Sequence, residues 1–589
     1  MKIFFLPDNK TVETDGSESV LSAASKAGVI IDGNCGGAGT CGKCKVQVTD
    51  GSQKGFHLAC RLFPEGDMTV QVPQYSESLK RKSEMSSLMR GLSANSGFEK
   101  RAAEPEKALL EDQKSDEERL KAALFPKGGG EIASSLLGEL QTVMGGAVTV
   151  TATVRGKEII HIEEGDKSGE CYGLSFDVGT TTVVGMLVNL ISGEVIGMEA
   201  EANPQAAHGA DVISRIMFAG ESRENLKLMQ SEIVKCLNRI AEGLAGTHGV
   251  SMGHIYDSVV AGNTTMSHLL LGVDPKRLAL VPFTPVFCEA ARMKAGEFGL
   301  KINRMADVTL LPNIAGHVGS DITAGIVASG IIEKRGNHLL IDVGTNGEIV
   351  LCADGRAVCC STAAGPAFEG ASIYQGMRAA SGAIERVDIT ENGVSIRVIG
   401  GKKPSGICGS GIIDAVSELF KAGLIDRTGK LFTREKALEK GIAAELAGRL
   451  RDGKTGREFV LAYIDDADDV AITQKDIREV QLAKAAMRAG IGLLMKEFGL
   501  AEKDLQYVYI AGAFGNHIRT ESAVGIGLIP DIGEEKILYI GNAAGIGAVM
   551  ALLSLEARGH AKETAKKIRH IELAVDPSFQ EVYLAAMAF

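Results

Sequence analysis

Residues 172–190 read YGLSFDVGTTTVVGMLVNL, and residues 339–355 read LLIDVGTNGEIVLCADG. In each stretch an apolar segment ends at an aspartate, a Val-Gly-Thr turn follows, and a second apolar segment begins. Alternating apolar residues on both sides of a glycine turn predict a β-hairpin in each copy. The return of one pattern later in the chain indicates an internal duplication.

A third segment, LQYVYIAGAFGNHI at residues 505–518, predicts an apolar strand that runs into a glycine-rich turn and then a helix. Glycine lets a chain turn tightly, so that backbone N–H groups face an oxyanion, and threonine hydroxyls add donors. Aspartates such as Asp177 and Asp342 can hold Mg²⁺ through water and order an attacking water. Two facing hairpins would bind a triphosphate from both sides, and the turn at 511–515 would let an adenine lie against bare backbone.

This arrangement resembles the ASKHA superfamily of acetate and sugar kinases, heat-shock chaperones and actin, over residues 171–589. The resemblance implies a duplicated α/β ATPase domain that binds ATP and Mg²⁺, with Asp177, Asp342 and Glu348 as catalytic residues. Glu348 could orient water or form a salt bridge between strands, and the sequence leaves both roles open. The implied nucleotide-binding residues are Gly179, Thr180, Thr181, Thr182, Gly344, Thr345, Asn346, Gly347, Gly365, Gly512, Ala513 and Gly515.

Four cysteines lie near the start of the chain: Cys35, Cys41 and Cys44 in GNCGGAGTCGKC, and Cys60 in HLACRLF. A close trio followed by a distant fourth thiolate is the plant-type layout of a [2Fe–2S] cluster, here with five rather than four residues in the first gap. Glycines between the sulfurs let backbone N–H groups approach and tune the cluster. A structural zinc site is the main alternative, although zinc favours two closely spaced ligand pairs.

The residues around these cysteines predict a hairpin, a short helix and two further strands, which is the element order of a β-grasp ferredoxin. The seven cysteines beyond Cys60 are scattered and no signal peptide precedes the cluster motif. Disulfides are therefore disfavoured, and a reducing cytoplasm is the expected location. The net charge of -11 argues against nucleic-acid binding, and no apolar run is long enough to span a membrane.

A chain of 589 residues is long enough for several domains, and shifts in composition suggest where they begin. Residues 1–75 form the predicted ferredoxin domain, and residues 76–130 form a charged, partly helical linker whose simplest interpretation is a solvated spacer. Residues 131–170 are predicted to form a small connector of a helix and a hairpin. Residues 171–335 and 336–589 are the two predicted ASKHA subdomains.

Across its whole length the sequence resembles the reductive activators of corrinoid-dependent proteins, which have this domain order. The resemblance implies ATP-dependent, one-electron reduction of an inactive Co(II) corrinoid protein to Co(I), with the [2Fe–2S] cluster as electron carrier. The implied partners are that corrinoid protein and an upstream low-potential electron donor, and a homodimer is compatible with the family. The runs that carry the resemblance are NPQAAHGADVISRI (203–216), AGNTTMSHLLLG (261–272), LPNIAGHVGSDITAG (311–325), YIAGAFGNHI (509–518) and IPDIGEEKILYIGNAAGIGA (529–548).

Three other functions compete with this one. An ATP-dependent low-potential electron donor to another metalloenzyme would share the nucleotide fold, but that class carries a [4Fe–4S] cluster between subunits. A respiratory-type ferredoxin subunit would need flavin and nicotinamide motifs, which the sequence lacks. A non-redox ATPase or kinase with a structural metal would be separated by iron and sulfide analysis.

Some further side chains have simple packing roles as their first interpretation. Polar packing is favoured over metal ligation for His208, His268, His317 and His517. Cys359, Cys360 and Cys408 are expected to be buried thiols. Ser361, Ser372 and Ser381 are weak candidates for a loop oxygen that faces the corrinoid, with a turn hydrogen bond as the alternative.

Overall fold

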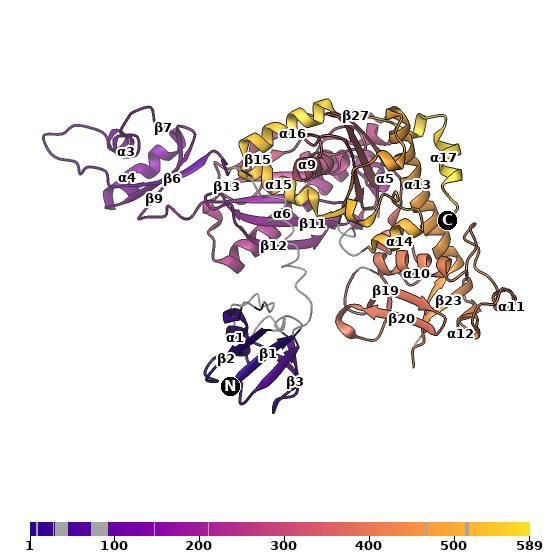
Figure 1. The fold of residues 1–589 in the computed structure, drawn as a ribbon. Helices are drawn as coiled ribbons and strands as arrows, with labels where there is room; N and C mark the ends of the chain where they lie inside the picture. The colour runs from indigo at the N-terminus through magenta and orange to yellow at the C-terminus, as the bar shows by residue number, and fades with distance from the viewer. Residues whose placement is uncertain are drawn as a thin grey trace. The chain divides into compact units, whose positions relative to one another are not determined.

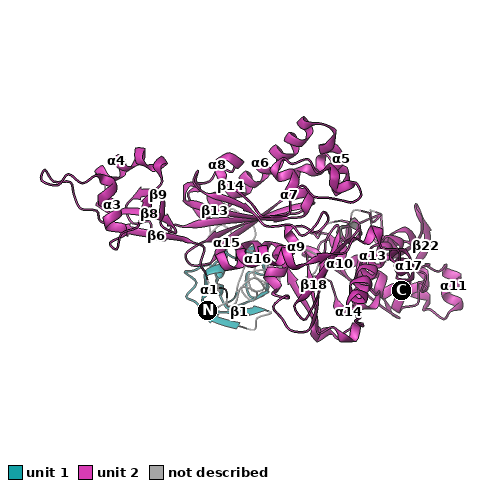
Figure 2. Cartoon of the chain, turned by 90° about the horizontal axis from the view of Figure 1, so that it is seen from above, with its two compact units in different colours: residues 1–87 teal, residues 88–589 magenta. Residues whose placement is uncertain are grey.

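The structure is a computed structural model. It describes residues 1–6, 10–27, 29, 45–71, 92, 94–146, 148–209, 211–370, 372–377, 379–465, 468–512 and 518–589. The chain divides into two compact units, residues 1–87 and residues 88–589 (Figure 2).

Unit 1 is a mixed β-sheet with a helix against it, as the sequence predicts. Its strands are β1 (Lys2–Leu6), β2 (Lys10–Glu13), β3 (Lys45–Asp50), β4 (Gly55–Leu58) and β5 (Met68–Gln71), and its helix is α1 (Val20–Lys26). The strands pair in the order β2-β1-β5-β3-β4, with β1 and β5 parallel and the other pairs antiparallel. Ile3 and Phe5 alternate with outward residues along β1 and bury their side chains with Val20 of α1. This is the predicted β-grasp fold.

Unit 2 begins with a small sheet that we call the small lobe, residues 95–169. Its strands pair in the order β6-β8-β9-β7, and two helices contribute to its apolar core. The elements are β6 (Phe98–Ala103), α3 (Asp116–Leu124), β7 (Glu131–Ile132), α4 (Leu137–Gly146), β8 (Val150–Arg155) and β9 (Glu158–Glu164). The hairpin β8–β9 and both helices were predicted. Ser115 starts α3 with a capping box, in which its hydroxyl accepts from the Glu118 N–H and the Glu118 carboxylate accepts from the Ser115 N–H.

Strand β6 corrects the interpretation of the charged segment as a solvated spacer. Residues 98–103 pair along their whole length with β8, from Phe98 opposite Arg155 to Ala103 opposite Val150. The sequence FEKRAA hides this strand because Lys100 and Arg101 interrupt the apolar alternation. The Lys100 side chain is nevertheless fully buried, through an ion pair with Glu163.

The first large sheet of unit 2 contains the first predicted hairpin. Its strands pair in the order β12-β11-β10-β13-β15-β14. They are β10 (Tyr172–Val178), β11 (Thr182–Asn189), β12 (Val195–Ala202), β13 (Ile255–Gly262), β14 (Ala291–Lys294) and β15 (Asp307–Leu310). The associated helices are α5 (Val212–Glu221), α6 (Arg223–His248), α7 (Thr264–Leu271), α8 (Ala295–Phe298) and α9 (Ser320–Ser329).

The second large sheet repeats five strands of this topology, and its sixth strand lies at the opposite edge. Its order is β26-β25-β16-β17-β18-β27, from β16 (Asn337–Val343), β17 (Gly347–Ala353), β18 (Arg356–Thr362), β25 (Tyr507–Ala511), β26 (Ile537–Gly541) and β27 (Arg569–His570). In both sheets three consecutive strands pair antiparallel. On its other side, the first of the three pairs with a parallel strand, which in turn pairs with a second parallel strand. The predicted internal duplication is therefore confirmed at the level of strand order.

Helices α9 and α15 (Ala543–Leu553) lie side by side, and α15 also packs against β10 and β13 (Figure 1). The remaining helices of unit 2 are α10 (Gly409–Lys421), α11 (Arg434–Glu439), α12 (Ala444–Gly448), α13 (Gln474–Phe498), α14 (Thr520–Gly525), α16 (Leu555–Lys567) and α17 (Phe579–Ala585). Two small sheets are inserted after β18: β19 (Ala383–Thr390), β20 (Gly393–Val398) and β21 (Gly406–Ile407), then β22 (Leu450–Gly453), β23 (Gly456–Ala462) and β24 (Val470–Thr473).

Among the helices that the structure describes, none combines the length and the apolar character needed to cross a bilayer.

Candidate active site

The two predicted aspartates occupy equivalent places in the two large sheets. Asp177 lies near the end of β10 and is paired across the parallel strand β13 with Ala261. Asp342 lies near the end of β16, directly opposite Glu348 of β17 and beside Ala511 of β25. The fold therefore places the predicted catalytic residues Asp342 and Glu348 side by side at one hairpin.

A backbone hydrogen bond closes each predicted glycine turn. The Gly179 N–H donates to the Thr182 carbonyl at 3.0 Å, and the Gly344 N–H donates to the Asn346 carbonyl at 3.0 Å. A Cβ atom on Gly179 would lie 2.7 Å from the Thr182 oxygen, so only glycine fits there. Thr345 and Asn346 are half-buried in the second turn.

Two asparagine side chains hydrogen-bond the first turn, and a third hydrogen-bonds the aspartate before it. Asn203 donates its Nδ2 to the Gly179 carbonyl at 2.8 Å, and its own N–H donates to the Thr181 carbonyl. Asn263, which caps α7, donates its Nδ2 to the Thr180 hydroxyl at 3.0 Å. Asn542, which caps α15, hydrogen-bonds Asp177.

A carboxylate that the sequence analysis did not select completes the site. Asp321 lies in the first turn of α9, where one of its oxygens accepts from the Ile322 N–H at 2.8 Å. The Ser320 hydroxyl, which donates to the Gly262 carbonyl at 2.9 Å, holds this turn against the end of β13. Gly319 permits the approach, because a Cβ atom there would lie 2.4 Å from the Asn263 Cα.

The pKa of each of these carboxyl groups is raised, mainly by burial. Burial raises the pKa of Asp177 to about 7, with repulsion from Asp321 as the second cause. Burial and then repulsion from Asp321 and Asp177 raise the pKa of Asp342 to about 7. The pKa of Asp321 is raised to about 6 by burial, against the hydrogen bonds that its carboxylate accepts from the backbone.

Glu348 belongs to the same cluster. Burial, followed by repulsion from Asp321 and Asp342, holds its pKa well above the usual range. The Ser361 hydroxyl donates to its Oε1 at 3.3 Å, which gives this serine a partner inside the cluster rather than on an outer loop. Acidic groups that repel one another are stabilised by a bound cation, and an all-oxygen set suits Mg²⁺.

Of the predicted glycines in the second half that the structure describes, Gly512 lies directly against this cluster. A Cβ atom on Gly512, whose φ is +97°, would lie 2.4 Å from the Val343 carbonyl and 2.9 Å from the Asp342 carboxylate. One on Gly347 would lie 2.7 Å from the Thr362 hydroxyl. Gly365 also has a positive φ, of +74°, with open space beside it. Ala513 and Gly515 lie outside the described residues.

Cys60 is the described member of the predicted cluster ligands. It follows β4, is 8% exposed, and packs in the core of unit 1. Cys35, Cys41 and Cys44 lie outside the described residues, so the cluster geometry stays a prediction.

The predicted packing roles hold for His208, His268 and the three cysteines, whereas the Ser372 hydroxyl is buried and forms no hydrogen bond to the described residues. His208 pairs with Glu232 at 3.0 Å, and the His268 ring lies between the Thr264 carbonyl and the Val286 N–H. Cys359, Cys360 and Cys408 are buried. His517 lies outside the described residues.

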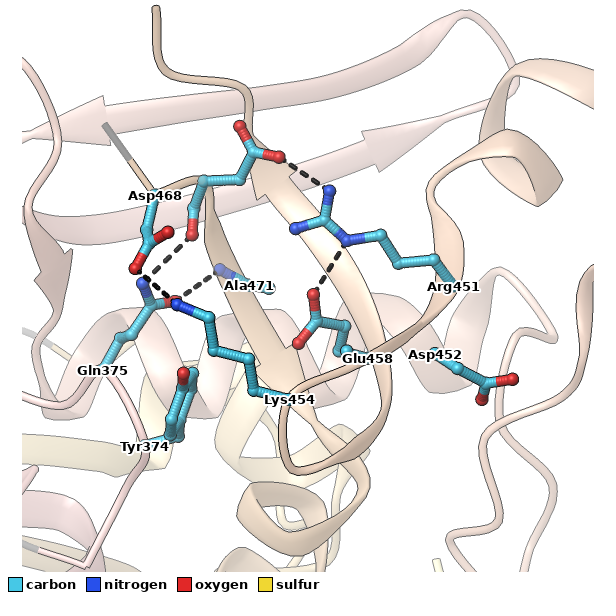
Figure 3. A pocket seen from close by; sticks show the side chains of 10 residues that line it. Tyr374, Gln375, Arg451, Asp452, Lys454, Glu458, Asp468 and Ala471 are labelled. Carbon is cyan, nitrogen blue, oxygen red and sulfur yellow. Dashed lines mark hydrogen bonds and ion pairs between the residues drawn. The ribbon is translucent and has the colours of Figure 1, made fainter. Parts of the chain in front are cut away.

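A separate pocket of about 290 Å³ lies beside β22, β23 and β24 (Figure 3). Its cations are already paired: Arg451 contacts Glu458 at 2.8 Å and Asp469 at 2.7 Å, and Lys454 contacts Asp468 at 3.1 Å. The pocket contains none of the predicted site residues, and we do not assign the nucleotide to it.

The sequence analysis missed Asn203, Asn263, Asp321 and Asn542, which lie in runs that were quoted only for their family resemblance. A local signal existed in two cases. Asp321 follows a Gly-Ser pair at the start of a helical pattern, and Asn263 precedes one, which are typical places for first-turn and capping residues.

Models of known families match four successive parts of the chain. Residues 4–65 match the 2Fe-2S iron-sulfur cluster binding domain, residues 87–169 the RACo linker region, and residues 172–334 the RACo middle region. Residues 336–589 match the C-terminal domain of RACo, described as the ASKHA domain.

Individual relatives agree with these matches. The corrinoid activation enzyme RamQ of Eubacterium limosum is 34% identical over 100% of this chain and 99% of its own length. The [Co(II) methylated amine-specific corrinoid protein] reductase of Methanosarcina barkeri is 26% identical over 71% of this chain and 77% of its own. A solved structure of a reductive activator for corrinoid, iron-sulfur protein is 36% identical, with a TM-score of 0.76 over 100% of this chain and 98% of that one. The chain therefore belongs to the family of reductive activators of corrinoid proteins.

Proposed function

We propose that this protein reduces the inactive Co(II) form of a corrinoid protein to Co(I), one electron at a time, and that ATP binding and hydrolysis drive the step. The observation that carries the ATP part is a group of buried carboxyls with raised pKa, which consists of Asp177, Asp342 and Glu348 in the two duplicated hairpins and Asp321 at the start of α9. The similarity to corrinoid activators over the full length supports the corrinoid protein as the substrate.

We assign the roles at the nucleotide site as follows. Asp177, Asp321 and Asp342 would hold Mg²⁺, which neutralises the phosphates and the repulsion among these carboxyls. Glu348, beside Asp342, would orient the attacking water. The backbone and hydroxyl donors of residues 179–182 and 344–347 would bind phosphate oxygens, and the adenine would lie near Gly512.

A [2Fe–2S] cluster held by the four cysteines of unit 1 would supply the low-potential electron. Plant-type clusters have reduction potentials of about −400 mV. We expect the Co(II)/Co(I) couple to lie lower. A gap of roughly 200 mV would oppose the transfer by about 4–5 kcal/mol, because about 59 mV is a tenfold change for one electron. ATP can offset a gap of this size if the two nucleotide states bind the corrinoid protein with different affinity.

A direct test mixes the reduced protein with candidate Co(II) corrinoid proteins and follows the Co(I) absorption band. We expect Co(I) to form with MgATP and to form far less with MgADP. If Co(I) never forms with any candidate, the corrinoid assignment fails. If it forms equally well without nucleotide, the ATP coupling fails.

A further inference from the structure

Two histidines and a glutamate come together where the small lobe meets the first large sheet, away from the residues assigned to the nucleotide. His161 and Glu163 are two positions apart on β9, so their side chains share one face of the small sheet. His254 ends a short 3₁₀ turn at Met252–His254, directly before β13. One nitrogen from each histidine and one oxygen from Glu163 all lie within 4.8 Å of one another.

Glu163 and His254 contact each other, and each also contacts a charged side chain outside the group. The second nitrogen of His254, Nδ1, lies 2.8 Å from a Glu170 oxygen, while its Nε2 lies 2.7 Å from Oε2 of Glu163. The other oxygen of Glu163 pairs with the buried Lys100 ammonium, and the other oxygen of Glu170 pairs with Lys167 at 2.9 Å. Each glutamate thus turns one oxygen to a lysine and one to His254.

His161 provides an independent observation. Its ring lies beside the rings of His254 and Tyr256, with centroids 6.3 Å and 5.7 Å away. Within the part of the chain that the structure describes, its side chain forms no hydrogen bond, although it is only partly exposed. A half-buried imidazole that faces two possible ligands and has no hydrogen-bond partner is suited to bind a metal.

We propose that His161, Glu163 and His254 bind a divalent transition-metal ion of the Zn²⁺ class. A set of two imidazoles and one carboxylate is a known zinc ligand set, and it suits ions that prefer nitrogen and oxygen. Metal-bound histidines usually donate their other ring N–H to a carboxylate, and metal-bound carboxylates are themselves hydrogen-bonded. Lys100 occupies the second of these positions. Glu170 lies 2.8 Å from His254 Nδ1 without forming a hydrogen bond to it, so a small rotation of the His254 ring would place it in the first.

Binding requires the three ligand atoms, which now lie within 4.8 Å of one another, to move to the spacing of a coordination shell. Ligand atoms of a tetrahedral zinc site lie about 3.3 Å apart, given metal–ligand distances of about 2.0–2.1 Å. The Glu163 Oε2 and His254 Nε2 atoms would therefore separate slightly from 2.7 Å, which rotation of the Glu163 carboxylate allows. The ion would join β9 to the segment before β13, beside the Arg155–Asp307 and Arg304–Glu139 ion pairs that link the same two parts.

The test uses the full-length protein with its iron–sulfur cluster assembled, so that the cluster cysteines do not take up zinc. The protein is equilibrated with Zn²⁺ in excess Mg²⁺, dialysed, and analysed for zinc and iron by mass spectrometry. We expect one more zinc per chain in the wild type than in the double variant His161→Gln, His254→Gln. We also expect zinc to raise the Tm of the wild type by about 3 °C or more, and not that of the double variant.

Two further variants keep the result interpretable. His208→Gln removes a half-buried histidine that pairs with Glu232 elsewhere in unit 2, and it should bind zinc as the wild type does. Glu170→Gln removes only the supporting carboxylate, and it should weaken zinc binding about 10–100-fold. If the wild type binds no more zinc than the double variant, or if His208→Gln loses as much, the cluster is an ion-pair network and the proposal is wrong.

Discussion

At the scale of single residues, Asp342 is the centre of the candidate active site. It faces Glu348 across a strand pair, it is repelled by Asp321 and Asp177, and its carboxylate lies against Gly512. Substitution Asp342→Asn keeps the shape and removes the charge that would hold Mg²⁺. We expect ATP hydrolysis to fall by about 100-fold or more, as for loss of a main electrostatic group, while the cluster absorption spectrum is unchanged.

The matched control for this variant is Glu391→Gln, at an exposed turn between β19 and β20. It should hydrolyse ATP at the wild-type rate. An Asp342→Asn protein that retains full ATP hydrolysis would contradict our assignment of this carboxylate, and loss of its cluster spectrum would contradict the independence of the two units.

The raised pKa of Asp342, about 7 against an ordinary value of 3.8, makes a prediction about stability in the absence of Mg²⁺ and nucleotide. Because the folded-state pKa is the higher one, the stability that this group contributes is complete below about pH 4 and is lost as the pH rises through 7. Asparagine carries no charge at any of these pH values. The free energy of unfolding of Asp342→Asn should therefore rise relative to that of the wild type between pH 4 and 8, by about 1–4 kcal/mol. Denaturant titrations at several pH values measure this difference, and a difference that does not change with pH would argue against it.

The sequence predicted Asp177, Asp342 and Glu348 because each directly precedes or follows a recognisable glycine turn. It did not predict Asp321 or Asn542, which reach the cluster only through tertiary packing. Asp321 lies on a helix far along the chain, and nothing in its own neighbourhood says that the helix begins beside β13. The four carboxyls could be recognised as one group only once the sheets were in place.

At the scale of elements, the start of α9 positions Asp321, and Gly319 makes this possible. Gly319→Ala would place a Cβ atom 2.4 Å from the Asn263 backbone, so α9 must move away from β13. We expect a loss of about 1–3 kcal/mol in free energy of unfolding, as for other overpacked sites. The affinity for MgATP should fall as well, since Asp321 moves with the helix.

Gly246→Ala is the control at this scale. This glycine lies on an exposed position of α6 with open space around it, and alanine there should stabilise the helix by about 0.5–1 kcal/mol. Urea unfolding and nucleotide titration measure both variants. Equal stability and equal nucleotide affinity of Gly319→Ala and the wild type would show that α9 can shift freely, contrary to our account.

Strand β6 is an element that the apolar pattern of the sequence did not predict. FEKRAA has no apolar alternation, yet all six residues pair with β8. Lys100 is buried there because Glu163, on a strand much later in the chain, neutralises it. A buried charge is explained only by its partner, and the partner is known only from the fold.

At the scale of the whole molecule, we expect unit 1 and unit 2 to bind their cofactors independently of each other, although both serve one reaction. Cys60→Ala should abolish the visible absorption of the cluster, because three thiolates remain where four are needed. It should leave MgATP binding by unit 2 within about twofold of the wild type, measured by calorimetry at 25 °C. Cys288→Ala, at a half-buried thiol of unit 2, should change neither property.

A strong loss of MgATP affinity in Cys60→Ala would contradict this separation. It would mean that the cluster unit contributes to the nucleotide site, and the roles assigned to Asp177 and Asp342 would then be incomplete.

The central claim is that ATP makes an unfavourable reduction of Co(II) possible. The most direct measurement is the yield of Co(I) when a corrinoid protein is mixed with this protein. The ambient potential is held at about −400 mV, where a plant-type cluster is half reduced. We predict that Co(I) forms with MgATP, and that at least about tenfold less Co(I) forms with MgADP or with the Asp342→Asn variant. A Co(I) yield that is the same in all three conditions would contradict it.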